Sequence, residues 1–393
     1  MAMPIIISNL ERKKGKSRPL YQQISNQVRF HIESGKLNPG DRLPPISDLV
    51  NQCGVDYKTI NLALQDLERE GLIRCELGRG KGPIVTRNSN CKYSIMFIRW
   101  NRDVLSLEIS DGIQRFATQR GLKYVIVDAS QSHEHVIDAI AHPIQNVNGI
   151  VMMPHERSGY SQAVLGFLKT GRKMVFVDRV LDDIPVSSVS IDHVSGAFKA
   201  TKHLLGAHGL PVYYVGSTND PSSVRDRLVG WSVAMRQHGF AEIKPYICGF
   251  SQPEHELATD ENLGLKSDYD ATRNLLSTTK EKKISIFAVN DNVAKGIYTV
   301  AESLGLKIGI DLYIASFGNM PLCEQLTVPL TSVMQSNELI GYEAANLLFM
   351  SLLGEIKKPV RRVLPAEVII RASSTGAISE RQDCSNQQVS LVK

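Results

Sequence analysis

The segment from Gly54 to Gly82 constrains the fold of this chain more than any other part of the sequence. Apolar residues recur in it at the i, i+3, i+4 and i+7 spacing of a helix with one buried side: Ile60, Ala63, Leu64 and Leu67. Asp56 precedes this helix as a candidate cap, and Gly71 follows it where a left-handed residue would end it. A basic, glycine-rich turn then runs from Gly78 to Gly82. Two helices and such a turn, in this order, are typical of a winged helix-turn-helix domain.

Polar residues at the start of the same helix face away from its buried side and form a candidate reading surface: Tyr57, Lys58, Thr59 and Asn61. A helix presented after a tight turn, with polar residues near its N-terminus, can enter the major groove of DNA. In the glycine turn, Gly80 would let the backbone lie close to the duplex, so that Arg79 and Lys81 reach phosphates or the minor groove. The sequence therefore predicts that this segment reads double-stranded DNA.

Patterns around this segment complete a small domain. A first helix is predicted over residues 20–34, with Ile24, Val28 and Ile32 on one stripe, and a second helix over residues 46–52. Residues 72–75 and 84–85 are predicted to pair as the two strands of the wing.

Positive charge is concentrated at this end of the chain. The first 90 residues contain 14 Lys and Arg against 9 Asp and Glu, whereas the remaining 303 residues contain 31 of each. A basic small segment joined to a neutral large one favours polyanion binding by the small segment alone. A solvated surface with a basic N-terminal tail at residues 1–17 is the alternative explanation.

Length and composition indicate a multidomain globular protein. At 393 residues the chain has room for two or three domains, and 42% hydrophobic and 22% charged residues are ordinary proportions. The 6 cysteines are scattered without a C-x-x-C pair, which argues against a disulfide framework or a zinc site. The sequence shows no signal peptide and no run of roughly 18 apolar residues. We therefore expect a cytoplasmic protein without membrane contact, metal or other cofactor.

Several motifs in order across residues 18–86 resemble the N-terminal domain of the GntR family of bacterial transcription regulators. The motifs are Pro19–Ile24, Gly40–Pro44, Thr59–Ile60, Ala63–Leu64, Leu67–Ile73 and Gly78–Gly80. The resemblance adds Arg18, Arg42 and Ser47 to the expected DNA-contacting residues. A degenerate domain that no longer binds DNA is the alternative.

Departures from the family pattern bear on DNA preference. Pro45-Ile46-Ser47 stands where the family has Ser-Glu-Arg, and Tyr57 and Asn61 replace two arginines of the reading helix. Arginine is the usual bidentate partner of guanine, whereas asparagine prefers adenine. We therefore expect an operator that is less rich in G at those positions.

From Cys91 onward, apolar strands alternate with amphipathic helices. Strands are predicted at residues 93–98, 124–128, 149–153, 174–178, 212–216, 284–290 and 313–318, with another near Tyr246. Helices are predicted at residues 107–120, 195–208, 224–238, 293–304 and 339–353. The alternation predicts parallel sheets covered on both faces, and about a dozen strands are more than one compact sheet usually takes. The expected fold is two α/β lobes behind a winged head.

Ligands of such lobes bind at the C-terminal ends of the strands. The side chains expected there are Arg99, Trp100, Asp178, Arg225, Phe250 and Asp291. Carboxylates and an arginine form bidentate hydrogen bonds with vicinal hydroxyls, and a flat aromatic ring packs on apolar C–H edges. The set therefore suits a polyhydroxylated ligand. A turn or cap role for Asp178 and a core role for Trp100 are the alternatives.

Residues 92–371 resemble the effector domain of the LacI/GalR family, which shares its fold with periplasmic sugar-binding proteins. The resemblance is carried by Ser222–Arg227 with Gly230-Trp231, by Phe287–Asp291 with Ala294 and Gly296, and by Pro329–Val333 with Gln335 and Gly341. It implies that Arg225 and Asp291 hold ligand hydroxyls. The weaker candidates are Asp178, Gln335, Phe250, Phe317, Arg99 and Trp100.

The same resemblance implies how the body divides. One lobe would contain about 92–191 with 335–361, and the other about 192–334 with 362–371; residues 251–266 look like a longer loop than usual. Residues 87–91 resemble a short polar linker without the hinge helix of LacI-type repressors, so DNA reading should rest on the winged domain alone. The polar residues 372–393 are expected to form a disordered tail.

A GntR-like head on a LacI-like body resembles the arabinose-repressor subgroup. The expected protein is a homodimer that places two heads on a palindromic operator, and a small sugar or sugar derivative closes the lobes and switches DNA binding. Repression is favoured, with activation and a phosphorylated-sugar or nucleoside effector as alternatives. An enzyme on a Rossmann-like sheet would need a G-x-G-x-x-G motif after a strand, and a transport protein would need a signal peptide; neither is found.

Overall fold

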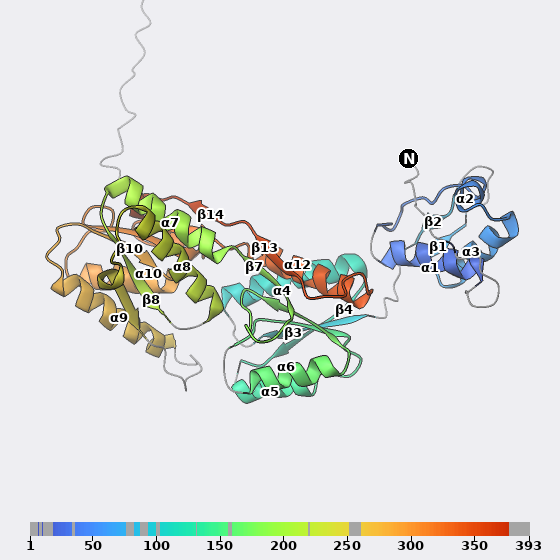
Figure 1. Cartoon of the computed structure of the whole chain (residues 1–393), viewed down its shortest axis with the longest axis horizontal. Coiled ribbons are helices and arrows are strands. Elements are labelled where there is room, and N and C mark those ends of the chain that lie inside the picture. The colour runs from blue at the N-terminus through green and yellow to red at the C-terminus, as the bar shows by residue number, and fades with distance from the viewer. Residues whose placement is uncertain are drawn as a thin grey trace, which may run out of the picture.

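The computed structural model describes residues 7, 10, 19–33, 36–75, 82–86, 93–99, 103–130, 132–155, 159–218, 221–250 and 261–376, except for the side chains of 33, 250 and 261–268. The described elements form a small helical head and two α/β lobes (Figure 1), so the predicted fold class is confirmed. No helix within these ranges is both long and apolar enough to cross a membrane. Several predictions lie outside the described residues: the basic tail, the linker 87–91, Arg18, Arg79, Gly80, Lys81 and Trp100.

The head has three helices and a two-stranded antiparallel sheet, as the sequence predicted. They are α1 (Leu20–Glu33), α2 (Ile46–Cys53), α3 (Tyr57–Arg69), β1 (Ile73–Arg74) and β2 (Ile84–Val85). Their apolar stripes share one core, in which Ile24, Ile60 and Leu67 are fully buried. Arg29 on α1 and Glu70 just after α3 form a 2.6 Å ion pair at the margin of this core.

Local chemistry fixes both ends of α3. The carboxylate of Asp56 accepts a 2.7 Å hydrogen bond from the backbone N–H of Thr59, which caps the first turn. At the other end Gly71 has φ of 71°, and the N–H of Leu72 donates to the carbonyl of Leu67 at 3.0 Å. The predicted cap and the predicted glycine ending are both confirmed.

The first lobe is built on a six-stranded parallel sheet with the strand order β13-β7-β6-β5-β3-β4. Its strands are β3 (Ser94–Arg99), β4 (Lys123–Asp128), β5 (Gly149–Met152), β6 (Lys173–Val177), β7 (Ser187–Ile191) and β13 (Arg361–Leu364). Its helices are α4 (Val104–Arg120), α5 (His133–Ala141), α6 (Tyr160–Lys169) and α12 (Asn337–Leu352).

Alternate residues of β3 point into two separate cores. Ile95 and Phe97 pack in the core that α4 and α12 complete, whereas Met96 and Ile98 pack in the core of α5 and α6. Helices therefore cover both faces of the sheet, which is why this strand is apolar along its whole length. The α4–α12 contact is very close, because a Cβ on Gly112 would lie 1.9 Å from the carbonyl oxygen of Glu338.

The second lobe has a six-stranded sheet with the order β14-β12-β11-β10-β8-β9, in which only β14 runs antiparallel. Its strands are β8 (Val212–Ser217), β9 (Ile247–Phe250), β10 (Ile284–Ala288), β11 (Leu312–Gly318), β12 (Thr331–Met334) and β14 (Glu367–Ile369). Its helical segments are α7 (His193–His208), α8 (Ser222–Gln237), η1 (Lys244–Tyr246), α9 (Glu261–Thr278), α10 (Asp291–Ser303), α11 (Leu322–Gln325) and α13 (Ala372–Thr375).

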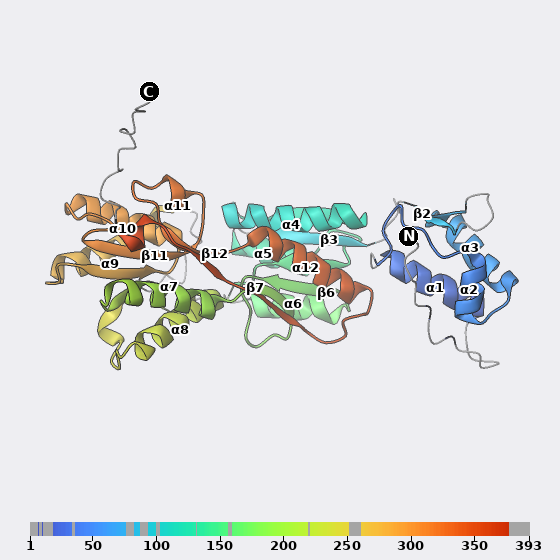
Figure 2. The same cartoon turned by 90° about the horizontal axis from the view of Figure 1, so that it is seen from above.

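The described chain passes between the lobes after β7, after β12 and after β13 (Figure 2). Because β13 pairs in parallel with β7, residues 362–364 belong to the sheet of the first lobe, three residues beyond the predicted boundary near 361. The last crossover instead falls between Leu364 and Glu367.

Two predictions of irregular structure were wrong. Residues 261–266, placed in a long loop, are the first residues of α9. Residues 372–375, placed in a disordered tail, form α13, where Ser373 Oγ donates to the carbonyl of Ile314 at 2.7 Å and accepts from the N–H of Thr331 at 2.8 Å. The serine is polar yet buried because it pairs with backbone groups of the second sheet.

Candidate DNA-binding surface and candidate ligand site

The exposed face of α3 carries side chains suited to a DNA major groove. Tyr57 and Lys58 are exposed, with 61% of Tyr57 accessible, and Asn61 is half-buried one turn further along. Leu62 and Gln65 lie on the same face and are exposed, although sequence reasoning missed them. On DNA, the cation of Lys58 can contact phosphates, and the amides of Asn61 and Gln65 can contact adenine edges. The apolar side chain of Leu62 can contact thymine methyl groups.

Other predicted DNA contacts also have local roles in the head. Thr59 Oγ1 donates to Asp56 at 3.1 Å, so this hydroxyl strengthens the cap of α3. Ser47 is exposed in the first turn of α2. Arg42 donates to the carbonyl of Gly82 at 2.9 Å and thereby positions the base of the wing. Contact of these residues with DNA stays a prediction.

Five buried side chains, four of them polar, meet at the junction of the two lobes. They are termed the inter-lobe cluster and comprise Asp178, His193, Arg227, Phe317 and Gln335. Asp178 follows β6 of the first lobe, His193 begins α7 and Gln335 follows β12 at a crossover, while Arg227 and Phe317 belong to α8 and β11. Each of the five residues is at most 6% exposed. Asp178, Gln335 and Phe317 were predicted as ligand residues, so the structure brings these three together.

The four polar members form a closed ring of hydrogen bonds. Gln335 Nε2 donates to Asp178 Oδ1 at 2.6 Å, and Arg227 Nη2 donates to Gln335 Oε1 at 3.3 Å. Arg227 Nε donates to His193 Nδ1 at 3.4 Å, and His193 Nε2 lies 3.2 Å from the backbone carbonyl oxygen of Asp178 and 3.3 Å from its Oδ1. The guanidinium also lies 4.0 Å from the centre of the Phe317 ring in a cation–π contact.

Burial and charge act against each other in this cluster. Burial raises the pKa of Asp178, but the interaction with His193 and the positive charges of Arg179 and Arg227 outweigh it, so the net pKa lies well below its ordinary value. Burial lowers the pKa of Arg227, and the charge of Asp178 opposes that shift. The cluster therefore holds an ionised carboxylate next to a guanidinium in a buried environment, an arrangement that can form strong hydrogen bonds with polar groups.

Asp291, one of the two main sequence candidates, is fully buried and bound by the chain itself. Ser316 and Ser332 donate to its Oδ1 at 2.5 and 2.6 Å, and the N–H of Met320 donates to its Oδ2 at 2.7 Å. A Cβ on Gly318, which has φ of 133°, would lie 2.7 Å from Oδ2. The carboxylate thus holds the turn after β11 in shape, and its contact with a ligand stays a prediction.

Arg225, the other main candidate, lies between the lobes, where its guanidinium pairs with Asp182 and is one third exposed. Three contacts join the segment 178–182 to the start of α8 and are termed the latch: Arg225 with Asp182 at 2.6 Å, Ser222 with Val180 at 3.0 Å, and Ser223 with Asp178 at 3.3 Å. It is Arg227, two residues further along α8, that enters the inter-lobe cluster. A ligand-binding role for Arg225 stays a prediction.

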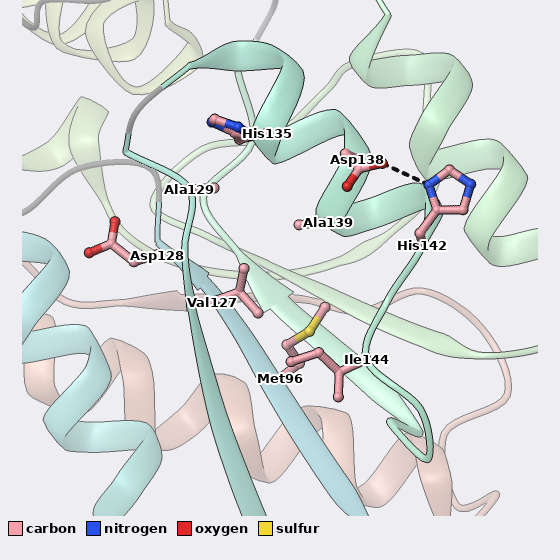
Figure 3. A pocket seen from close by; sticks show the side chains of 9 residues that line it. All are labelled: Met96, Val127, Asp128, Ala129, His135, Asp138, Ala139, His142 and Ile144. Atoms are coloured by element: carbon pink, nitrogen blue, oxygen red, sulfur yellow. Dashed lines mark hydrogen bonds and ion pairs between the residues drawn. The ribbon is translucent and has the colours of Figure 1, made fainter.

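The remaining candidates lie elsewhere. Arg99 ends β3 and pairs with Asp128 at the end of β4 at 2.8 Å. Phe250 is the last residue of β9, and its side chain lies outside the described part of the chain. A surface hollow of about 290 Å³ lies beside Asp128 and is walled by β4 and α5, with His135 at its margin (Figure 3). None of the predicted ligand residues in the described part lines this hollow.

Of the two cluster members that sequence reasoning missed, Arg227 carried a usable signal. The buried side of α8 includes Ser223, Arg227, Gly230 and Trp231, so Arg227 falls on the apolar stripe of an amphipathic helix. A charged residue on such a stripe must be paired inside the protein, which marks it as a candidate for a site. His193 gave no comparable signal.

Two parts of the chain match known families. Residues 20–81 match the bacterial regulatory proteins of the gntR family, and residues 201–374 match the periplasmic binding protein-like domain. Among curated proteins, the chain is 22% identical over 351 residues to the arabinose metabolism transcriptional repressor of Geobacillus stearothermophilus, covering 86% of this chain and 93% of the relative. It is 24% identical to the HTH-type transcriptional regulator CelR of Thermobifida fusca, covering 67% and 74%.

Solved structures share the fold of the body. A LacI family regulator of Enterococcus faecium with bound ribose superposes with a TM-score of 0.60 at 20% identity, covering 72% of this chain and 99% of that one. A complex of the regulator CelR with cellobiose gives a TM-score of 0.60 at 20% identity, covering 84% and 99%. The regulator CcpA of Lactococcus lactis gives 0.62 at 20% identity, covering 72% and 99%.

Proposed function

We propose that this DNA-binding transcription regulator, which joins a gntR-family domain to a LacI-type periplasmic-binding-protein-like domain, is a repressor switched by a sugar. It is not an enzyme. The observation that carries the proposal is the inter-lobe cluster, because Asp178, Arg227, Gln335 and Phe317 gather at a buried junction of the two lobes. The named functions of the relatives support the sugar class, since arabinose, ribose and cellobiose all appear among them.

A sugar would bind by replacing hydrogen bonds within the inter-lobe cluster. Its vicinal hydroxyls would donate to the Asp178 carboxylate and accept from the Arg227 guanidinium, in place of bonds that these groups now make to Gln335. The displaced amide of Gln335 would bond to a further hydroxyl of the sugar, so that the exchange leaves no polar group unpaired in the buried cluster. A purely apolar ligand would break the same bonds without replacing them.

Binding at this place acts directly on the connections between the lobes. His193 and Gln335 are cluster members, and each lies within two residues of a crossover strand end, Ile191 and Met334 respectively. A ligand that binds one lobe arrangement better than another shifts the balance between them by its differential affinity. In a homodimer bound to a palindromic operator, a change in lobe arrangement would alter the spacing of the two heads.

A thermal-shift screen of the full chain tests the ligand class. The panel contains L-arabinose, D-ribose, cellobiose, other pentoses and hexoses, sugar phosphates and nucleosides. A ligand at 100 times its Kd stabilises the folded state by about 2.7 kcal/mol, which raises the melting temperature by several degrees. We expect at least one sugar to do so in the wild type and not in Arg227→Ala. A panel in which only nucleosides stabilise the protein would contradict the sugar class.

A further inference from the structure

One edge of the first lobe carries basic side chains that the function proposed above does not use. They are termed the basic edge and comprise Lys123, Arg172, Lys173, Lys357 and Lys358. Lys123 and Lys173 begin β4 and β6, Arg172 precedes β6, and Lys357 and Lys358 lie between α12 and β13. All lie where the parallel strands of this sheet begin, and all but the half-buried Arg172 are exposed.

Four of these side chains surround one hollow. A depression of about 180 Å³ is lined by residues that include Arg172, Lys173, Lys357 and Lys358, and none of its described lining residues is acidic. Within the described part of the chain, none of the five basic-edge residues forms an ion pair with a carboxylate. Glu355 is the acidic residue in the adjoining segment. Since the chain beyond residue 90 contains equal numbers of basic and acidic residues, the patch is a local excess of positive charge.

The basic edge lies on the side of the lobe to which the DNA-binding head is attached. Ser94, the first residue of β3, is in register with Lys123 of β4. Thr86, after the last strand of the head, is separated from Tyr93 by residues 87–92. At no more than about 3.6 Å per residue, this segment keeps the two ends within about 25 Å of each other. A duplex that is held by the head and extends beyond the bases it reads can therefore come within reach of this edge.

We propose that the basic edge binds the DNA phosphates that flank the bases read by the head. Lysine and arginine side chains that are not paired with carboxylates release condensed counterions when they contact the phosphates of a polyanion. Such contacts add affinity and position the body on the duplex without reading sequence. The proposal rests on DNA binding by the head, and it assigns the body a direct share of the salt-dependent affinity.

The test uses the full chain and a duplex selected by that chain from a random-sequence library. The duplex is made in two lengths, one trimmed to the selected bases and one extended by about 10 base pairs, or one helical turn, at each end. The edge variant combines Arg172→Gln, Lys173→Gln, Lys357→Gln and Lys358→Gln. The control variant carries the same change in charge on exposed residues of the second lobe: Lys280→Gln, Lys282→Gln, Lys295→Gln and Lys307→Gln. Affinity is measured by fluorescence anisotropy from 50 to 200 mM KCl.

On the extended duplex, we expect the edge variant to bind on the order of tenfold more weakly, with a log–log salt slope shallower by about 0.9 for each phosphate that the variant no longer neutralises. On the trimmed duplex the edge variant should bind like the wild type. The control variant should bind both duplexes with the affinity and salt slope of the wild type. An equal reduction of affinity in the edge and control variants would show a long-range effect of net charge and overturn the proposal. An unchanged salt slope on the extended duplex would overturn it as well. Lys58→Ala distinguishes DNA binding by the head from phosphate binding by the basic edge. A loss of contacts in the head weakens binding to the trimmed and the extended duplex equally.

Discussion

The guanidinium of Arg225 lies 2.6 Å from the carboxylate of Asp182, so an ion pair crosses from the second lobe to the first. Asp182 is 65% exposed, and ion pairs this exposed contribute only about 0–1 kcal/mol. The buried ring around Asp178 and Arg227 crosses the same junction without solvent screening. The Arg225–Asp182 pair is therefore expected to stabilise the lobe arrangement less than the buried cluster does.

This difference separates two arginines that lie two residues apart. We expect Arg227→Ala to reduce sugar affinity at least about 100-fold, because it removes a buried charged donor worth roughly 3 kcal/mol. Arg225→Ala and Asp182→Ala should both have small effects, since each removes the same exposed ion pair. Isothermal titration calorimetry with the sugar that raises the melting temperature measures all three. A large drop in affinity in Arg225→Ala with none in Asp182→Ala would place Arg225 against the ligand instead.

Lowering the pH should reduce the free energy of unfolding that the ionised carboxylate of Asp178 contributes. The pKa of Asp178 in the folded chain is below its ordinary value of 3.8, so the carboxylate stabilises the folded state fully above that value. The contribution is lost as the pH falls below 3.8 towards the folded-state pKa. Urea unfolding at pH 7, 5, 4 and 3 should therefore show the advantage of the wild type over Asp178→Asn shrinking only at the lowest pH values. An advantage that grows on acidification would contradict the assigned pKa direction.

In the head, loss of a phosphate contact and loss of a base contact should affect DNA binding in different ways. Lys58→Ala should weaken binding to all duplexes alike and reduce the salt slope by about 1, because it removes a phosphate contact. Lys36→Ala removes the same charge from an exposed site outside α3 and serves as the control. Asn61→Ala should relax preference at a single base pair, at a cost of about 1–3 kcal/mol for the preferred base. Selection from a random library by wild type and variants reads out both effects.

Two glycines in helices of the first lobe give a matched test of packing. A Cβ on Gly112 would lie 1.9 Å from the carbonyl of Glu338, so Gly112→Ala must push α4 and α12 apart and should destabilise the lobe by about 1–3 kcal/mol or more. Gly166 on α6 has nothing within 4 Å of its Cβ position, so Gly166→Ala should stabilise by up to about 1 kcal/mol. Denaturant unfolding compares them, and similar effects at both positions would contradict the close helix contact.

The sequence predicted best where one helix carries its own signals. α3 combines an apolar stripe with an aspartate cap and a glycine ending, and all three act within about twenty residues. Strands with few apolar residues escaped prediction, because β7 and β12 bury Ser187, Ser188, Thr331 and Ser332, which composition alone marks as surface residues. Their hydroxyls are buried by neighbouring strands, which local patterns do not reveal.

The candidate ligand site was harder to predict than the fold for a physical reason. Its central bond joins Asp178 to Gln335, which are 157 residues apart and meet only after both lobes have folded. Asp178 was indicated by its position at a strand end, and family resemblance supplied Gln335 and Phe317, but the resemblance favoured Arg225 over Arg227. The choice between them depends on which side of α8 faces the junction, and the burial of that helix in the folded chain settles the orientation.

The central claim is that a sugar bound at the inter-lobe cluster changes DNA affinity. The most direct measurement is the Kd of the full chain for its selected duplex, with and without a saturating concentration of the sugar that most raises the melting temperature. Coupling free energies of about 1–3 kcal/mol predict a change of about 5–150-fold, which Arg227→Ala should abolish. A sugar that binds the wild type and leaves the Kd for DNA unchanged would contradict the account.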